Sequence, residues 1–268
     1  MSRKFPSIEV GIGAIGTSLD SSSATLTNFR SEARHLFFDL SNEWLNEEVD
    51  HPPLWHTFYE DGEPEGLADA VLAFVEMMVD SQHNISVSLL FQALQNCLDY
   101  LGDNQVDGYF LSVGSFVNPV DDSLLWYWTD GERSLKRARF FIPDVRLGAD
   151  LACLSRRQSN NTRVEISLLT PQKPGIEAQL AEVSEIFLEA ITLEQPALIN
   201  FAEADSTTVS SPASYIEIPQ EVAELHLVGE LPGLNPIYAG VAVRSVLEAC
   251  YRAGISIPIQ LAVKKRLS

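Results

Sequence analysis

The segment Ile8–Gly16, IEVGIGAIG, has the glycine spacing of a dinucleotide-binding turn. In such a turn the glycines open a helix that holds the pyrophosphate, and an acidic residue about twenty positions further on binds the ribose. Asp39 stands near that distance, but it lies inside a helical apolar pattern, and the glycines are followed by the poor helix former TSLDSSS. Ile8, Val10 and Ile12 alternate instead, so we expect one continuous strand whose glycines admit a bulge or a close neighbour. We predict no bound cofactor.

The densest group of possible metal ligands lies around residues 47–61. His51 and His56 stand there beside several carboxylates, and two imidazoles with one carboxylate can in principle hold a divalent metal. Their spacing matches no zinc motif, and two prolines between them make the backbone irregular. We therefore predict no metal. The cluster remains the best candidate for a metal-dependent or acid–base site if the chain is an enzyme without a linear signature.

The linear signatures of nucleophilic and phosphate-binding sites are missing from the sequence: it has no G-x-S-x-G elbow, P-loop, H-E-x-x-H or C-x-x-C. Cys153 precedes the pair Arg156 and Arg157, which would favour a thiolate, but its neighbours Ala152 and Leu154 favour burial. The sequence therefore leans toward a protein that is not an enzyme.

Two aromatic stretches, Trp55–Tyr59 and Leu125–Trp128, could form a binding surface. A groove with aromatic anchors and an acidic rim would suit a peptide or protein partner with apolar and basic residues, added as a strand at an open sheet edge. Arg137 and Arg139 share a predicted strand face and could bind a carboxylate. The alternative, that the aromatic residues belong to the core, stays open. The candidate binding residues are Trp55, Phe58, Tyr59, Trp126, Trp128, Arg137 and Arg139.

Charge is distributed unevenly along the chain. The net charge is −19, and residues 35–132 contain 19 Asp or Glu and no Lys or Arg, whereas a basic block follows and ends at Arg163. An acidic surface repels nucleic acid and attracts cationic partners. We predict a non-catalytic binding protein, for example an accessory protein that presents a peptide to a separate modifying enzyme. Acidic and basic blocks that cancel within the fold are the alternative, and their pairing between chains would give a homo-oligomer.

Length and composition indicate an ordinary globular protein. The chain has 268 residues, of which 46% are hydrophobic, which is enough for a substantial core. No apolar run is long enough to cross a membrane, and the N-terminus does not resemble a signal peptide. Cys97, Cys153 and Cys250 stand far apart among aliphatic neighbours, which is typical of buried thiols in a reducing compartment. We expect a cytoplasmic protein without membrane contact.

Helical spacing of apolar residues predicts three consecutive helices before residue 104. They cover Ser31–Glu48, a segment with Leu67, Val71, Phe74, Val75 and Met78 on one face, and Ser86–Leu101. Two further helices are predicted at Pro174–Leu193 and after the cap Asn235, with Pro236 in the first turn and Gly254 at the end.

Alternating and β-branched residues predict strands in the remainder of the chain. They are Tyr109–Val117, Leu124–Thr129, Leu135–Ile142, Arg163–Leu169, Ala197–Phe201, Ala223–Val228 and Ile255–Val263. Pro258 argues for an edge or bulge position of the last one. No repeat of fixed period is visible. We predict an α+β fold in which an N-terminal helical layer packs on a mixed, largely antiparallel sheet, with residues 1–268 as one compact domain and a possible lobe division near residue 104.

Overall fold

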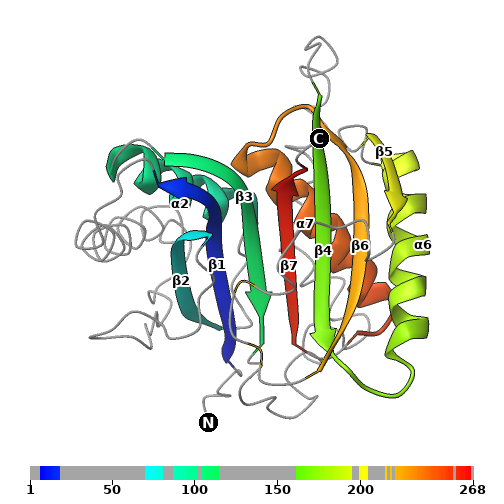
Figure 1. Ribbon diagram of the computed structural model, residues 1–268. Coiled ribbons are helices and arrows are strands. Elements are labelled where there is room, and N and C mark those ends of the chain that lie inside the picture. The colour runs from blue at the N-terminus through cyan, green and yellow to red at the C-terminus, as the bar shows by residue number, and fades with distance from the viewer. Residues whose placement is uncertain are drawn as a thin grey trace.

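The computed structural model describes residues 7–18, 70–80, 87–101, 104–114, 161–194, 199–204, 215, 218, 221–255 and 258–266. These residues form a seven-stranded sheet with three helices (Figure 1). The strands are β1 (Ser7–Ser18), β2 (Val71–Asp80), β3 (Asn104–Val113), β4 (Thr162–Pro171), β5 (Ile199–Glu203), β6 (Val222–Leu231) and β7 (Ile259–Lys265). The helices are α2 (Val87–Leu101), α6 (Ile176–Glu194) and α7 (Pro236–Arg252).

The strand order β2-β1-β3-β7-β4-β6-β5 contains the same arrangement twice. In the N-terminal half, β1 lies between β2 and β3, and α2 connects β2 to β3. In the C-terminal half, β4 lies between β6 and β7, and α7 connects β6 to β7. The halves meet where β3 and β7 pair antiparallel, so the sheet is made of two β-β-α-β units joined edge to edge. In the C-terminal half, α6 and β5 are inserted between β4 and β6.

The helices cover one face of the sheet, which we call the helix face. Alternate residues of the strands point into this layer, among them Ile12 of β1, Leu111 of β3 and Ile166 of β4, and all are buried with the apolar sides of the helices. Burial of such aliphatic side chains contributes about 1.5–3 kcal/mol each. The helix face is therefore a continuous apolar core that both halves share.

Helices α2 and α7 approach closely because α7 has a glycine at the crossing. A Cβ atom at Gly240 would lie 2.3 Å from Oγ of Ser88. The Ser88 hydroxyl donates a hydrogen bond to the carbonyl oxygen of Ile237 at 3.2 Å. The start of α7 is also as predicted, because Oδ1 of Asn235 accepts from the amide of Tyr238 at 3.0 Å and caps the helix.

The predicted N-terminal helical layer is wrong. The first helix among the described residues begins at Val87, and the segment predicted as the second helix forms β2, paired antiparallel with β1. The run VLAFVEMMV is apolar at nearly every position, so its helical spacing cannot be told from a strand buried on both faces. The helix predicted at Ser31–Glu48 lies outside the described residues. Every described strand pairing is antiparallel, so the expected mixed sheet is also wrong.

The C-terminal elements agree better with expectation, apart from the place of the last strand. Helix α6 and strands β4, β5 and β6 overlap their predicted ranges, whereas β7 lies in the middle of the sheet and not at an edge. Pro258 directly precedes β7, so its missing N–H removes no ladder bond, and its carbonyl oxygen accepts from Oγ1 of Thr170 at 2.9 Å. Strand β3 begins at Asn104, five residues before its predicted start. The strands predicted at 124–129 and 135–142 fall outside the part of the chain that the structure describes.

Candidate functional site

The candidate residues taken from the sequence all lie outside the described ranges. This holds for the aromatic and arginine set Trp55, Phe58, Tyr59, Trp126, Trp128, Arg137 and Arg139, and for His51 and His56. The structure neither brings them together nor separates them, so they remain predictions. The described residues offer a different set, on the face of the sheet opposite the helices, which we call the second face.

In the N-terminal half, the glycine motif of β1 makes room for aromatic rings on the second face. Gly13 is the register partner of Phe74 on β2 and of Phe110 on β3. A Cβ atom at Gly13 would lie 2.1 Å from the ring of Phe110, and one at Gly11 would lie 2.8 Å from the ring of Phe74. The motif therefore lies within a strand, as predicted, and its glycines form the floor under two rings and not a turn around a phosphate.

The rings above this glycine floor form an aromatic stack. Phe74 and Phe110 stack with centroids 5.7 Å apart, and Phe110 and Tyr215 stack at 5.3 Å. Phe110 and Tyr215 are buried, at 0% and 2% exposure, whereas Phe74 is only partly buried. Tyr215 is held in place because its amide donates to Oε1 of Gln260 on β7 at 3.1 Å. The stack thus crosses the second face from β3 to β2 and ends in a ring that is not fully covered.

In the C-terminal half, the same face carries polar and ionisable side chains. Ser167 of β4 is the register partner of His226 on β6 and of Ala262 on β7, and Glu165 is the partner of Lys264. Glu165 is 1% exposed and His226 is 5% exposed. Buried ionisable groups are costly unless they are paired, and they concentrate at functional sites. The sequence analysis did not predict this group of polar residues, although the alternation in RVEISLL places its Glu and Ser side chains on one face of a strand.

Two ionisable residues of the second face, His226 and Lys264, interact with carboxylates. Nε2 of His226 lies 3.0 Å from Oε2 of Glu224, and no described residue hydrogen-bonds its buried Nδ1. Burial lowers the pKa of Lys264 from 10.5, and the carboxylate of Glu165 opposes this effect in part. Ser167 makes no hydrogen bond to His226 among the contacts found in the described residues, so the three side chains Glu224, His226 and Ser167 do not form a nucleophilic triad.

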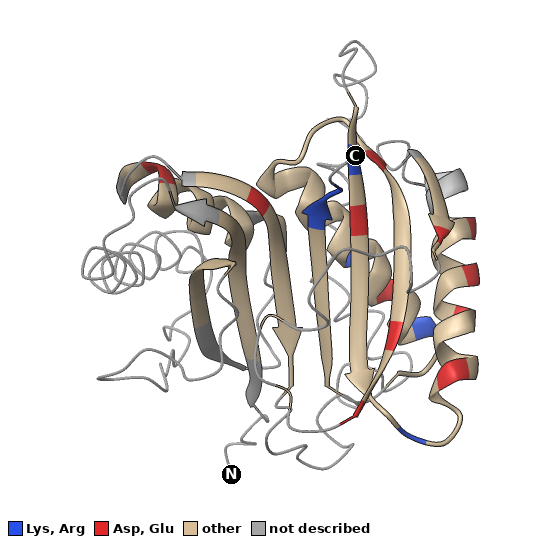
Figure 2. Cartoon of the chain, in the orientation of Figure 1, with Lys and Arg blue, Asp and Glu red and all other residues tan. Residues whose placement is uncertain are grey.

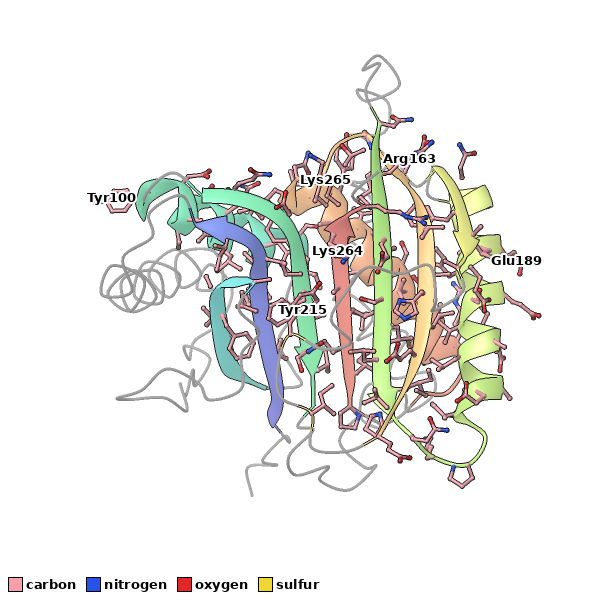
Figure 3. All side chains as sticks on the ribbon, viewed as in Figure 1. Tyr100, Arg163, Glu189, Tyr215, Lys264 and Lys265 are labelled. Atoms are coloured by element: carbon pink, nitrogen blue, oxygen red, sulfur yellow. The ribbon has the colours of Figure 1, made fainter. Side chains whose placement is uncertain are left out.

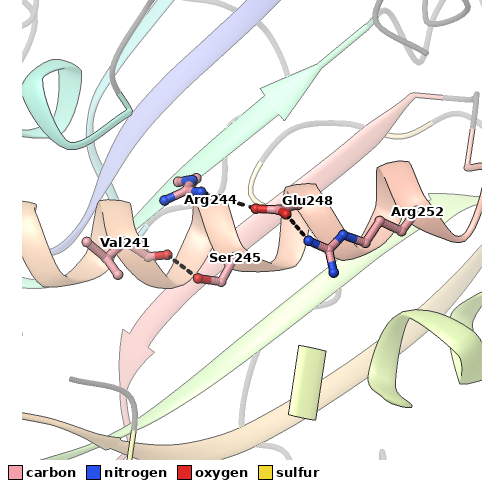
Figure 4. A network of polar contacts seen from close by, with 5 residues as sticks. All are labelled: Val241, Arg244, Ser245, Glu248 and Arg252. Carbon is pink, nitrogen blue, oxygen red and sulfur yellow. Dashed lines mark hydrogen bonds and ion pairs between the residues drawn. The ribbon is translucent and has the colours of Figure 1, made fainter. Parts of the chain in front are cut away.

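Two other buried polar residues, Arg244 and Ser245, form hydrogen bonds within α7. On α7, Glu248 binds Arg244 at 3.1 Å and also binds Arg252, one turn away on either side (Figure 4). The hydroxyl of Ser245 donates to the carbonyl oxygen of Val241 at 2.9 Å, which satisfies it within the helix. These contacts lie within one helix and tie its turns together.

Among the described residues, neither the two buried thiols nor the positions of possible metal ligands indicate a further site. Burial raises the pKa of Cys97 to about 11 and that of Cys250 to about 12, so both are protonated and unreactive at neutral pH. In the described ranges, no group of three His, Cys, Asp or Glu side chains is placed to hold a metal ion. None of the described helices combines the length and apolar character needed to cross a membrane.

The outer edge of β2 is the second candidate feature. Among the described residues β2 pairs only with β1, so it forms one edge of the described sheet. Its ten residues have only two charged side chains, Glu76 and Asp80, both acidic. At the opposite edge, β5 has five residues, a register shift and a positive φ of 54° at Asn200. Short, bulged edges resist strand addition, and β2 is the longer of the two edges of the described sheet.

Comparison with known proteins gives no relative to guide the choice. No model of a known protein family matches this chain, and no curated protein is detectably similar to it in sequence. The geometry of the second face and of the β2 edge is therefore the basis for a proposal about function.

Proposed function

We propose that this protein is a non-catalytic binding protein that holds an extended segment of a peptide or protein partner along the outer edge of β2. The observation that carries the proposal is the ten-residue strand β2 at one end of the described sheet, with Phe74 as the partly buried end of the aromatic stack. Free cysteines at Cys97 and Cys250 support action in a reducing compartment such as the cytoplasm.

The backbone of β2 supplies affinity in this proposal. Along one side of an antiparallel edge strand, alternate residues direct their N–H and C=O groups outward. A partner in extended conformation satisfies these groups with main-chain hydrogen bonds, independently of its sequence. Strand β2 is largely apolar, so the added strand would also extend the buried surface of the sheet.

The side chains beside the edge supply selectivity. Phe110 and Tyr215 close the stack on the inner side, whereas Phe74 has no described ring beyond it. Neighbouring strands place side chains about 4.5–5.5 Å apart, so a partner residue opposite Phe74 would continue the stack. We expect that residue to be aromatic or large and aliphatic.

The negative charge of the region around β2 determines which polar residues the partner segment should contain. Strand β2 lies inside residues 35–132, which contain no Lys or Arg, and itself contributes Glu76 and Asp80. A segment with lysine or arginine beside its apolar residues would complement this region, and its association would weaken as salt screens the charges.

The test uses a fluorescent ten-residue peptide that alternates valine with lysine and has one central phenylalanine. We expect it to bind in fluorescence anisotropy, and a version with glutamate in place of lysine to fail. Two further versions are N-methylated at alternate residues, one in each register. Strand addition predicts that one register abolishes binding and the other does not, because only one set of N–H groups faces the protein.

Hydrogen exchange and a matched pair of variants locate the site. Amides of Val71–Asp80 should become protected when the peptide binds, and Phe74→Leu should weaken binding by about fivefold through loss of ring stacking. Phe187→Leu, at a buried ring that packs edge-on against Phe201, controls for general destabilisation and should leave the affinity unchanged. Equal binding by both N-methylated peptides, or protection confined to other strands, would contradict the proposal.

A further inference from the structure

Basic side chains gather at one end of β4 and β7. Seven lysines and arginines fall within the described ranges, and four of them lie at this end: Arg163, Lys264, Lys265 and Arg266. Figure 3 shows Arg163, Lys264 and Lys265 together at the end of these two strands, and Figure 2 shows acidic residues along α6. In a chain with a net charge of −19, this concentration of positive charge needs an explanation.

The strand register brings three of the cations onto one face. Lys264 is the partner of Glu165 on β4, so it lies on the second face. The ladder continues one step further, because the amide of Arg266 donates to the carbonyl oxygen of Arg163 at 3.0 Å. Arg163 and Arg266 are therefore directly opposite each other, and both alternate onto the same face as Lys264.

This placement is unfavourable in the absence of an anion. Like charges that face each other across paired strands destabilise a sheet. None of the side chains of Arg163, Lys264 and Arg266 forms an ion pair with a described residue, although two carboxylates are close in register. Glu165 faces Lys264, and Glu230 faces Arg163 and accepts from Nδ2 of Asn161 at 3.1 Å. Three cations and two carboxylates leave this part of the face positively charged.

The neighbouring strand β3 packs closely against Lys264. Gly108 on β3 is the register partner of Lys264. A Cβ atom at Gly108 would lie 2.8 Å from Cβ of Lys264, so any larger residue would crowd the lysine stem. The strand thus presents no side chain on the flank of Lys264 that faces β3.

We propose that Arg163, Lys264 and Arg266 form a binding site for a small dianion with phosphate chemistry. Two guanidinium groups offer forked donors that match phosphate oxygens, and the ammonium group adds a point charge. A dianion bound between the two arginines removes the repulsion between them. A polyanion such as nucleic acid is disfavoured by the charge of the whole chain, which points to a free phosphate or a small phosphate monoester. This site is separate from the β2 edge and does not depend on the function proposed there.

The test measures thermal unfolding and isothermal titration with inorganic phosphate and with phenyl phosphate, at constant ionic strength set with chloride. Each should raise Tm of the native chain, because a ligand that binds only the folded state stabilises it. Arg163→Gln and Arg266→Gln should each weaken the affinity by about tenfold or more, as expected for loss of a charged hydrogen bond. Tighter binding of phenyl phosphate would identify a monoester as the ligand, and equal binding would identify free phosphate.

Control variants separate a binding role from a structural one. Lys173→Gln removes the same charge beyond the other end of β4 and should leave phosphate binding unchanged. Arg163→Lys keeps the charge and should retain part of the affinity. Without phosphate, Arg163→Gln should be at least as stable as the native chain, because it relieves repulsion. An equal rise in Tm for the native chain and for Arg163→Gln, or no binding of either ligand, would overturn the proposal.

Discussion

The two halves of the sheet share one topology but differ completely on the second face. In the N-terminal half the centre of that face is Gly13 between Phe74 and Phe110, and in the C-terminal half it is Ser167 between His226 and Ala262. The helix face shows no such contrast, because both halves contribute aliphatic residues to one core. The shared face holds the fold together, so the differences on the second face are where the halves can have acquired separate roles.

The comparison also explains why the glycines of β1 are needed. A ring lies flat on the sheet only where the strand beneath it lacks a side chain, and Gly11 and Gly13 provide that surface. In β4 the corresponding face has side chains, Glu165 and Ser167, and the position of Phe110 is taken by the small residue Ala262, against which Tyr215 packs. Apolar rings therefore fill one half of the face, and ionisable groups fill the other.

The largest loss of stability should come from adding a side chain at Gly13, beneath the aromatic stack. Gly13→Ala would place a methyl group 2.1 Å from the buried ring of Phe110, which cannot move without breaking its stack on both sides. Overpacking of this kind costs about 3 kcal/mol of unfolding free energy, measured by urea denaturation. Gly233→Ala, where a Cβ meets nothing within 4 Å, should stay within about 0.5 kcal/mol of the native chain.

A double-substitution cycle shows whether this cost arises from the ring. If Phe110 is the cause, Gly13→Ala should cost much less in a Phe110→Ala background, since coupled neighbours depart from additivity by about 0.5–3 kcal/mol. Strictly additive losses would show that Gly13 acts through its backbone and not through the aromatic stack.

A reciprocal exchange between the halves should have a smaller effect with opposite signs. Phe74→His puts a polar ring at the end of the stack and should destabilise the fold by about 2 kcal/mol. His226→Phe removes a buried imidazole that no described residue satisfies at Nδ1, and should be neutral or stabilising by up to about 1 kcal/mol. Urea denaturation of both variants measures the exchange. A loss of about 2 kcal/mol or more for His226→Phe would mean that the polar half is a requirement of folding, as the aromatic half is.

The smallest expected effect is a pH dependence of the folding stability that arises from Lys264, in the C-terminal half of the second face. The folded pKa of Lys264 lies below its ordinary value of 10.5, so between the two values the unfolded chain binds more protons than the folded chain. Stability contributed by this group therefore rises with pH through that window and is lost as pH falls through it. We expect the native chain to gain stability relative to Lys264→Met as pH approaches 10.5.

Comparison with Lys264→Met is necessary because other groups act in the opposite direction. Burial raises the pKa of Cys97 to about 11 and that of Cys250 to about 12, and burial with the nearby Asp99 also raises the pKa of Tyr109. These groups destabilise the fold as pH rises, and they do so equally in both proteins. A stability difference that does not change with pH would contradict an effect of Lys264.

Local patterns were sufficient for the elements of the C-terminal half. Helix α7 could be placed because Asn235, Pro236 and Gly254 mark its ends by backbone chemistry that does not depend on the rest of the fold. The segment Arg163–Leu169 was likewise predicted as a strand, although its polar face was not. The same reasoning failed for β2, because an apolar run without alternation satisfies either period.

The sequence by itself determined that Ile8–Gly16 is a strand, that helices follow residues 86, 174 and 235, and that Cys97 and Cys250 are buried thiols. Only the tertiary structure decided that β2 is a strand at the edge of the sheet, that β7 lies at its centre, and that Phe74, Phe110 and Tyr215 meet over glycine. The physical reason is the range of the interactions. Caps, turns and side-chain alternation act over a few neighbouring residues, whereas strand order, ring stacking and the meeting of Arg163 with Arg266 join positions that are far apart in the chain.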